Sequence, residues 1–247
     1  MARTNASTRD SDRFGRDGLL EFAVGYPRTV GWRPTLVGGL LVLLSILVLP
    51  VFVLLGYQAR LGRSAANGWP QPELVDVGDL FVEGLKLFAV LLPPVLLFAG
   101  VYATFVLGGT AVESDALVTA GGLVVLVLYL LLVFLVPALQ TGYYVTGSVT
   151  RTFTSGVVTD FAFTGYYVKA TLVYLVLVVV ANVVYLVSIV TIVGPLFVAA
   201  FFAFAQGSFW GYAYYRAAER GIVPPPSEFG PDTPPGHPGE HDRTAKF

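Results

Sequence analysis

The chain has 247 residues, of which 55% are hydrophobic and only 13% are charged, and its mean hydropathy is +0.72. A soluble domain carries about 25% charged residues, so this composition excludes an ordinary soluble protein and predicts a membrane protein. The net charge of −1 argues against a nucleic-acid partner, which needs a basic surface, and the lack of cysteine excludes disulfides and zinc–thiolate sites.

Residues 1–33 form a polar leader with six arginines. The leader is too long for a signal peptide, so we expect no cleavage. The apolar residues between Leu19 and Ala23 fit a short interfacial helix, with Trp32 at the level of the lipid headgroups. A partly disordered tail is the alternative for residues 1–17.

A membrane domain is predicted at residues 34–221, as an all-α polytopic bundle. The uncharged run that contains the first span has about 26 residues, or roughly 39 Å of helix, against the ~30 Å that a bilayer core requires. Pro50 should kink this span, and Pro93-Pro94 should break or strongly bend the next one. The five predicted spans are 35–57, 87–107, 117–143, 170–190 and 196–215.

Two stretches between the spans are predicted to be amphipathic helices that lie along the membrane interface. In residues 73–86 the apolar side chains recur three or four residues apart, opposite the charged ones. The apolar set is Leu74, Val77, Phe81 and Leu85, and the charged set is Asp76, Asp79, Glu83 and Lys86. The second stretch is 151–169. The tail at 222–247 is rich in proline, glycine and charge, so we expect it to be disordered.

An internal duplication is also indicated. Two apolar runs each begin with Gly-Gly-Leu, contain a proline and a Gly-Tyr pair, and are followed by arginine, aspartate, glycine and lysine. The duplicated unit would be span, interfacial helix, span. The alternative is that these residue types recur at helix ends in any membrane protein. The residues that define this candidate structural or interaction site are Pro50, Gly56, Tyr57, Arg60, Arg63, Asp79, Gly84 and Lys86 in the first copy, and Pro137, Gly142, Tyr143, Asp160, Gly165 and Lys169 in the second.

The topology follows from the basic residues, which favour the cytoplasmic side. Five spans put both interfacial stretches and the C-terminus inside, but they leave the arginine-rich leader outside. If the first run were instead a re-entrant hairpin bent at Pro50, the leader would also lie inside. We favour five spans and leave the side of the N-terminus open.

Polar chemistry inside the membrane is sparse. No charged residue lies between the ends of a predicted span, so proton relays and ion-coupling sites are not expected. Asn182 and Gln206 are candidates for a polar pathway, although hydrogen bonding between helices, worth roughly 0.5–2 kcal/mol, is the interpretation we favour. The two histidines, His237 and His241, lie in the tail, and Walker and nucleophile-elbow patterns are absent. We therefore expect no catalytic residues, no cofactor and no metal.

Many of these residues together resemble an uncharacterised family of membrane proteins from halophilic archaea, domain of unknown function 4013. The matching pattern is Tyr26-Pro27, Trp32, Gly38-Gly39, Pro50, Gly56-Tyr57, Arg60, Arg63, Asp79, Gly84-Leu85-Lys86 and, near the end, Gln206, Trp210-Gly211 and Tyr215. The resemblance implies a multi-pass domain in an archaeal plasma membrane and supplies no activity.

The function predicted from the sequence is that of a non-catalytic membrane component that packs with lipid, with another membrane protein or with itself. The alternative is a small transporter or permease-like subunit. A transporter would line a water-accessible cavity near mid-membrane with Asn182 and Gln206. A membrane-embedded enzyme is the least favoured hypothesis. The C-terminus is predicted to be cytoplasmic.

Overall fold

The computed structural model describes residues 18–25, 32–44, 49–74, 76–191 and 194–229. Within these ranges every regular element is helical, which confirms the all-α prediction. The α-helices are α2 (Leu19–Gly25), α3 (Arg33–Leu44), α4 (Leu49–Ala66), α5 (Val77–Tyr102), α6 (Gly108–Ala111), α7 (Asp115–Thr146), α8 (Val149–Thr154), α9 (Val157–Ala162), α10 (Gly165–Ser188) and α11 (Gly194–Glu219). A π-helical turn, η3 (Ala103–Leu107), joins α5 to α6, and a 3₁₀ turn, η4 (Pro226–Glu228), follows α11.

Among the described residues, four helical segments are long and apolar enough to cross a membrane: Val77–Ala111, α7, α10 and α11. They contain 24 to 35 residues. At 1.5 Å per residue they measure roughly 36–52 Å, more than the ~30 Å of a bilayer core. The chain is therefore a multi-pass membrane protein. The predicted spans 87–107, 117–143 and 196–215 each fall within one of these segments, and the predicted span 170–190 extends two residues beyond the end of α10 at Ser188.

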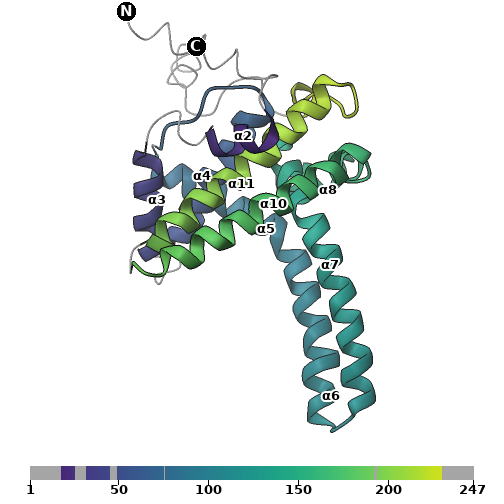
Figure 1. Ribbon diagram of the computed structural model, residues 1–247. Helices are drawn as coiled ribbons and strands as arrows, with labels where there is room; N and C mark the ends of the chain where they lie inside the picture. The colour runs from purple at the N-terminus through teal and green to yellow at the C-terminus, as the bar shows by residue number, and fades with distance from the viewer. Residues whose placement is uncertain (1–17, 26–31, 45–48, 75, 192–193, 230–247) are drawn as a thin grey trace, which may run out of the picture.

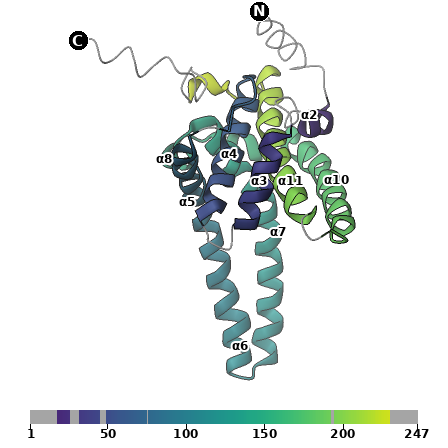
Figure 2. The ribbon, with the colours of Figure 1, turned by 90° about the vertical axis from the view of Figure 1, so that its left-hand side faces the viewer.

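The first predicted span, 35–57, is not one helix. It is divided between α3 and α4, which lie side by side and antiparallel, and both pack on α11 (Figure 2). With 12 residues, α3 measures roughly 18 Å, too short to cross a bilayer. Pro50 is the second residue of α4, where its missing N–H costs no helical hydrogen bond, so it begins a helix and does not kink one. This arrangement matches the re-entrant alternative and not the single crossing that we favoured.

The α5–α7 hairpin, made of α5, η3, α6 and α7, extends well beyond the other helices (Figures 1 and 2). Contrary to the predicted break, α5 continues through Pro93 and Pro94. Prolines are tolerated in membrane helices because lipid offers no water to freed backbone groups, so further unwinding would cost several kcal/mol for each unpaired group. α5 therefore runs as one helix from Val77 to Tyr102, and it packs on α7.

The first predicted interfacial helix is the beginning of α5 and not a separate element. Its buried face carries Leu80, Gly84 and Leu87, whereas Val77 and Leu85, on the predicted apolar face, are exposed. The close approach of α4 at Gly84 decides which face of α5 is buried. The second stretch, 151–169, is divided among α8, α9 and the first turn of α10.

α4 lies at the centre of the bundle, because glycines let its backbone touch both neighbouring helices. A Cβ atom at Gly56 would overlap the carbonyl oxygen of Leu80 on α5, and one at Gly84 would overlap that of Phe52 on α4. On the other side, a Cβ atom at Gly211 of α11 would overlap the carbonyl oxygen of Gly62. Small residues permit this spacing, and the resulting van der Waals contact drives helix association in lipid.

The segments that flank the membrane helices pack on the same end of the bundle. Phe22 of α2 is buried and stacks on Tyr212 of α11, with ring centroids 3.8 Å apart. α2 is thus docked on protein, where the sequence predicted an interfacial helix. After α11, the Tyr214 hydroxyl donates to the carbonyl oxygen of Pro224 at 2.9 Å, so the beginning of the predicted disordered tail has a defined position. Residues 1–17 and 230–247 lie outside the described residues.

Gly84→Ala tests whether the contact between α4 and α5 determines stability. We expect a loss of about 2 kcal/mol or more, because overpacking costs ~1–3 kcal/mol and the new methyl group meets rigid backbone. Gly100→Ala, in the same helix with no atom within 4 Å of its Cβ position, is the matched control and should be neutral or stabilising by up to about 1 kcal/mol. Unfolding in detergent micelles, followed by circular dichroism, measures both, and equal stability of the two variants would contradict the packing argument.

Candidate functional site

Most of the first copy of the predicted site converges at one end of the bundle. Gly56, Arg60 and Arg63 are spaced four and three residues apart, so they share one face of α4. That face packs on α5, which contributes Glu83 and Gly84. The side chain of Lys86 is exposed. Pro50 is distant in sequence from this end of α4 and serves to begin the helix.

Arg63, Glu83 and Tyr143 form a charged triad that joins α4, α5 and α7. The Arg63 guanidinium donates to the Glu83 carboxylate through Nη2 at 3.2 Å and Nη1 at 3.5 Å. The Tyr143 hydroxyl donates to Glu83 Oε2 at 2.6 Å, and the Arg63 guanidinium lies 5.9 Å from the Tyr143 ring centroid. The side chains of Arg63 and Glu83 are only 7% and 17% exposed. Charge-assisted hydrogen bonds of this kind are about twice as strong as neutral ones.

Arg60 and Asp79 form a weaker second pair. The closest approach, from Arg60 Nη2 to Asp79 Oδ2, is 3.9 Å, and the Asp79 side chain is 76% exposed. Water screens such a carboxylate, so the pair contributes at most about 1 kcal/mol. The prediction that the charged residues of 73–86 form a solvated face therefore holds for Asp79 but not for Glu83.

Tyr57 anchors the loop between α4 and α5. Its hydroxyl donates to the carbonyl oxygen of Pro72 at 3.2 Å and accepts a hydrogen bond from Gln71 Nε2 at 3.2 Å. Its ring is buried and contacts Phe204 edge to face. The Gly-Tyr pair thus supplies close helix packing through Gly56 and a buried contact for the loop through Tyr57.

The second copy does not form an equivalent cluster. Only Tyr143 joins the triad. Pro137 is buried within α7, and Gly142 lies against the side chain of Val158. Asp160 and Lys169 are exposed, and a Cβ atom at Gly165 would have no neighbour within 4 Å. The internal duplication therefore stays a prediction, and the two copies make different contacts.

The two predicted intramembrane polar residues, Asn182 and Gln206, form hydrogen bonds with different partners. Gln206 Nε2 of α11 donates to Gln140 Oε1 of α7 at 2.9 Å, a hydrogen bond between helices. Asn182 is exposed on α10, and its Nδ2 donates to the carbonyl oxygen of Val178 in its own helix. A small cavity of about 180 Å³ between α10 and α11 is lined by Asn182 but not by Gln206. We favour interhelical hydrogen bonding for both residues, and these contacts agree with it for Gln206 but not for Asn182, which bonds within its own helix.

The hydrogen bonds of the triad connect three helices. Both oxygens of Glu83 accept hydrogen bonds from Arg63, and one also accepts a hydrogen bond from Tyr143, so both carboxylate oxygens have partners. Among the residues that the structure describes, no group of three or more His, Cys, Asp or Glu side chains is placed to hold a metal ion. The triad therefore orders three helices relative to one another.

Comparison with known proteins identifies the family. The family described as "Protein of unknown function (DUF4013)" matches residues 39–193, well over half of the chain. The chain belongs to the DUF4013 family. No curated protein and no solved structure matches it. The DUF4013 match includes Arg63, Glu83 and Tyr143, so the whole triad lies within the family domain.

Sequence reasoning missed Glu83 and Gln140 as site residues of this DUF4013 domain. Glu83 is four residues after Asp79, and Arg63 is three after Arg60, so the two helices present matched acidic and basic pairs. That spacing was the available signal for the ion pair. Gln140 lies in an apolar run three residues after Pro137, and no pattern in the sequence indicates that Gln206 is its partner.

Glu83→Gln tests the triad by leaving the Arg63 charge buried without its counter-ion. Breaking a buried pair costs ~3–5 kcal/mol, and because Glu83 is 17% exposed we expect about 2–4 kcal/mol. Asp79→Asn removes the same charge one turn earlier in α5 and should cost less than about 1 kcal/mol. Denaturation midpoints in detergent compare the two, and similar losses would show that the triad is no more important than the exposed pair.

Proposed function

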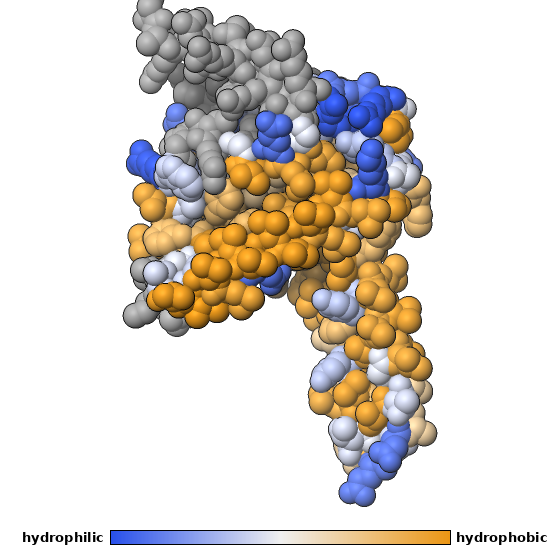
Figure 3. All heavy atoms as spheres, viewed as in Figure 1, coloured by the Kyte–Doolittle hydropathy of each residue, from blue (hydrophilic) through white to orange (hydrophobic). Residues whose placement is uncertain are grey.

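We propose that this DUF4013 protein is a non-catalytic component of the membrane that acts by packing its apolar helices against lipid, against another membrane protein or against a second copy. The observation that best supports this proposal is the exposed surface of the α5–α7 hairpin. Only 11% of the most apolar window of Val77–Ala111 and 17% of that of α7 is buried, against 56% for α11. Figure 3 shows apolar side chains over most of the hairpin, with hydrophilic residues at its tip.

The triad supports this proposal because it holds the hairpin in place. Glu83 lies near the start of α5 and Tyr143 near the end of α7, so Arg63 of α4 is connected to both arms. Backbone contact at Gly56 and Gly84 adds a second attachment nearby. A hairpin that is fixed at its base and apolar along its length is suited to presenting a constant surface to its surroundings.

The transporter alternative has lost its main support. It requires Asn182 and Gln206 to line one water-accessible cavity, whereas Gln206 is paired with Gln140 and Asn182 is bonded within α10. No specific contact favours an enzyme either. We therefore retain a packing role as the function that the geometry supports best.

For the topology, we propose that the basic end of the bundle, defined by Arg60, Arg63, Arg151, Lys169, Arg216 and Arg220, faces the cytoplasm in the plasma membrane. At the opposite end, the hairpin tip carries Glu113 and Asp115, and residues 188–194 carry no charge. The antiparallel pairing of α3 with α4 returns the chain to the side on which it entered. The arginine-rich leader and the C-terminus then lie on the same side, and the positive-inside rule holds throughout.

Single cysteines test this topology without background, because the chain has none. We expect a membrane-impermeant maleimide to label Val112→Cys at the hairpin tip in intact cells. Asn5→Cys and Phe163→Cys should label only after permeabilisation. Labelling of Asn5→Cys from outside would instead indicate five crossings and contradict the re-entrant arrangement.

Gln206→Cys separates packing from transport. A packed interface keeps this position away from water, so we expect no reaction with a hydrophilic maleimide in native membranes, from either side. Phe163→Cys, which is 83% exposed, is the positive control for reactivity. Rapid labelling of Gln206→Cys from both sides would reveal an aqueous path through the bundle and would favour a transporter.

A further inference from the structure

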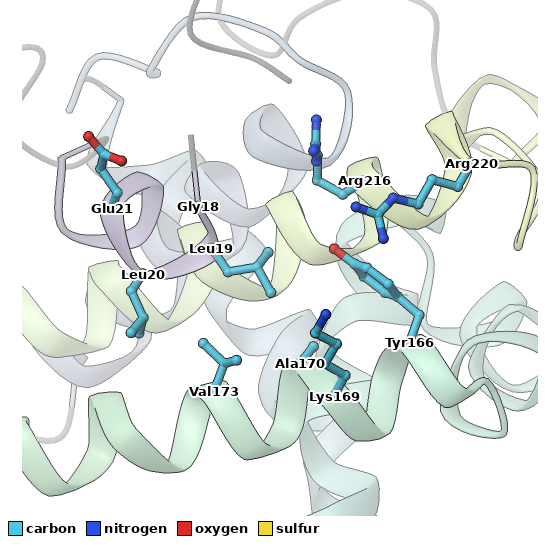
Figure 4. A pocket seen from close by; sticks show the side chains of 10 residues that line it. All are labelled: Gly18, Leu19, Leu20, Glu21, Tyr166, Lys169, Ala170, Val173, Arg216 and Arg220. Atoms are coloured by element: carbon cyan, nitrogen blue, oxygen red, sulfur yellow. The ribbon is translucent and has the colours of Figure 1, made fainter. Parts of the chain in front are cut away.

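A pocket of about 480 Å³ opens at the basic end between α2, α10 and α11. Its volume falls within the ~300–1,000 Å³ that is typical of small-ligand sites. Its walls combine basic side chains from α10, from α11 and from Arg220, the residue after α11, with apolar ones from α2 and α10 (Figure 4). It does not include any member of the charged triad.

The basic wall consists of Lys169, Arg216 and Arg220. The Arg220 guanidinium lies over the Tyr166 ring, 5.1 Å from its centroid, and Arg216 Nη1 is 3.2 Å from Glu219 Oε2. Neither Lys169 nor Arg220 forms an ion pair with another residue in the part of the chain that the structure describes. Among the described residues that line the pocket, Glu21 alone is acidic, and its carboxylate points away from these cations (Figure 4). The pocket thus favours an anion.

The apolar wall extends from the pocket into the membrane region. Leu19 and Leu20 of α2 point into the pocket from above α10, where Val173 faces them (Figure 4). Lys169, Val173, Val176 and Val180 follow one another at intervals of three or four residues, so they lie on one face of α10. Val176 and Val180 are exposed. An apolar path therefore leads from the cationic site along a helix that is long enough to cross the bilayer.

We propose that this pocket binds the phosphate headgroup of an anionic membrane lipid, with an acyl chain along Val173, Val176 and Val180. The inference rests on the membrane placement proposed above. Charge complementarity selects the headgroup, since Lys and Arg near a membrane surface attract anionic lipid. The adjoining apolar path selects a lipid over a water-soluble phosphate, which would gain nothing from it.

Native mass spectrometry of the full chain in detergent tests the proposal. The probes are phosphatidylglycerol, zwitterionic phosphatidylcholine and glycerol phosphate, which has the anionic group but no acyl chain. We expect the first to bind most tightly. Lys169→Gln combined with Arg220→Gln should weaken its binding roughly 30-fold, because each charge near an anionic headgroup is worth about a factor of five. Arg33→Gln combined with Arg151→Gln removes the same charge outside the pocket and should leave binding unchanged.

Three results would overturn the proposal. Equal loss in both double variants would indicate general electrostatic attraction and not a site. Equal binding of the two phospholipids would exclude selection by charge. Binding of glycerol phosphate as tight as that of phosphatidylglycerol would indicate a site for soluble anions. Alkaline extraction of membranes that contain each variant tests the membrane placement separately from the lipid pocket. A protein that stays in the membrane pellet but shows no lipid preference refutes the pocket and leaves the membrane placement intact.

Discussion

The contact of α4 with its neighbours through glycine is the constraint on which the rest of this structure depends. In lipid, apolar side chains gain little by leaving one apolar surrounding for another, so helices associate through close van der Waals contact and hydrogen bonds. Gly56 and Gly84 bring α4 against the backbone of α5, and Gly62 and Gly211 bring it against α11. A short, marginally apolar helix thereby becomes the centre of the bundle, and the longer helices lie around it.

The charged triad depends on that contact and strengthens it. Glu83 comes one residue before Gly84. The close approach of α4 at this glycine therefore also brings the Arg63 guanidinium within hydrogen-bond distance of the Glu83 carboxylate. Desolvating two charges is expensive, and the cost is offset only if their remaining hydrogen-bonding capacity is satisfied. Tyr143 supplies one such bond and at the same time links the third helix. Packing and polar pairing therefore specify the same arrangement of α4, α5 and α7.

Composition and run length were sufficient to predict the all-α membrane class, because an apolar segment of about 20 residues has few alternatives to a transmembrane helix. They could not decide how the first run folds, since Pro50 is compatible both with a kinked span and with the start of a new helix. They also could not show which face of α5 is buried against protein, because side-chain periodicity does not reveal where a partner helix touches a glycine. For the candidate site, the positions of Gly56, Arg63 and Gly84 were recognised from a repeated pattern. Their pairing with Glu83 and Tyr143 required the tertiary contacts.

The packing of α3 and α4 on α11 bears on how the protein is made. Gly38 of α3 lies against Phe204, and Gly62 of α4 lies against Gly211, so both early helices pack on α11, which is synthesised after α5, α7 and α10. Translation proceeds from the N-terminus, and α3 is too short to anchor itself across a bilayer. The first apolar region therefore stays incompletely packed at the membrane until α11 has been synthesised. During that interval the nascent polypeptide is the form most exposed to quality control.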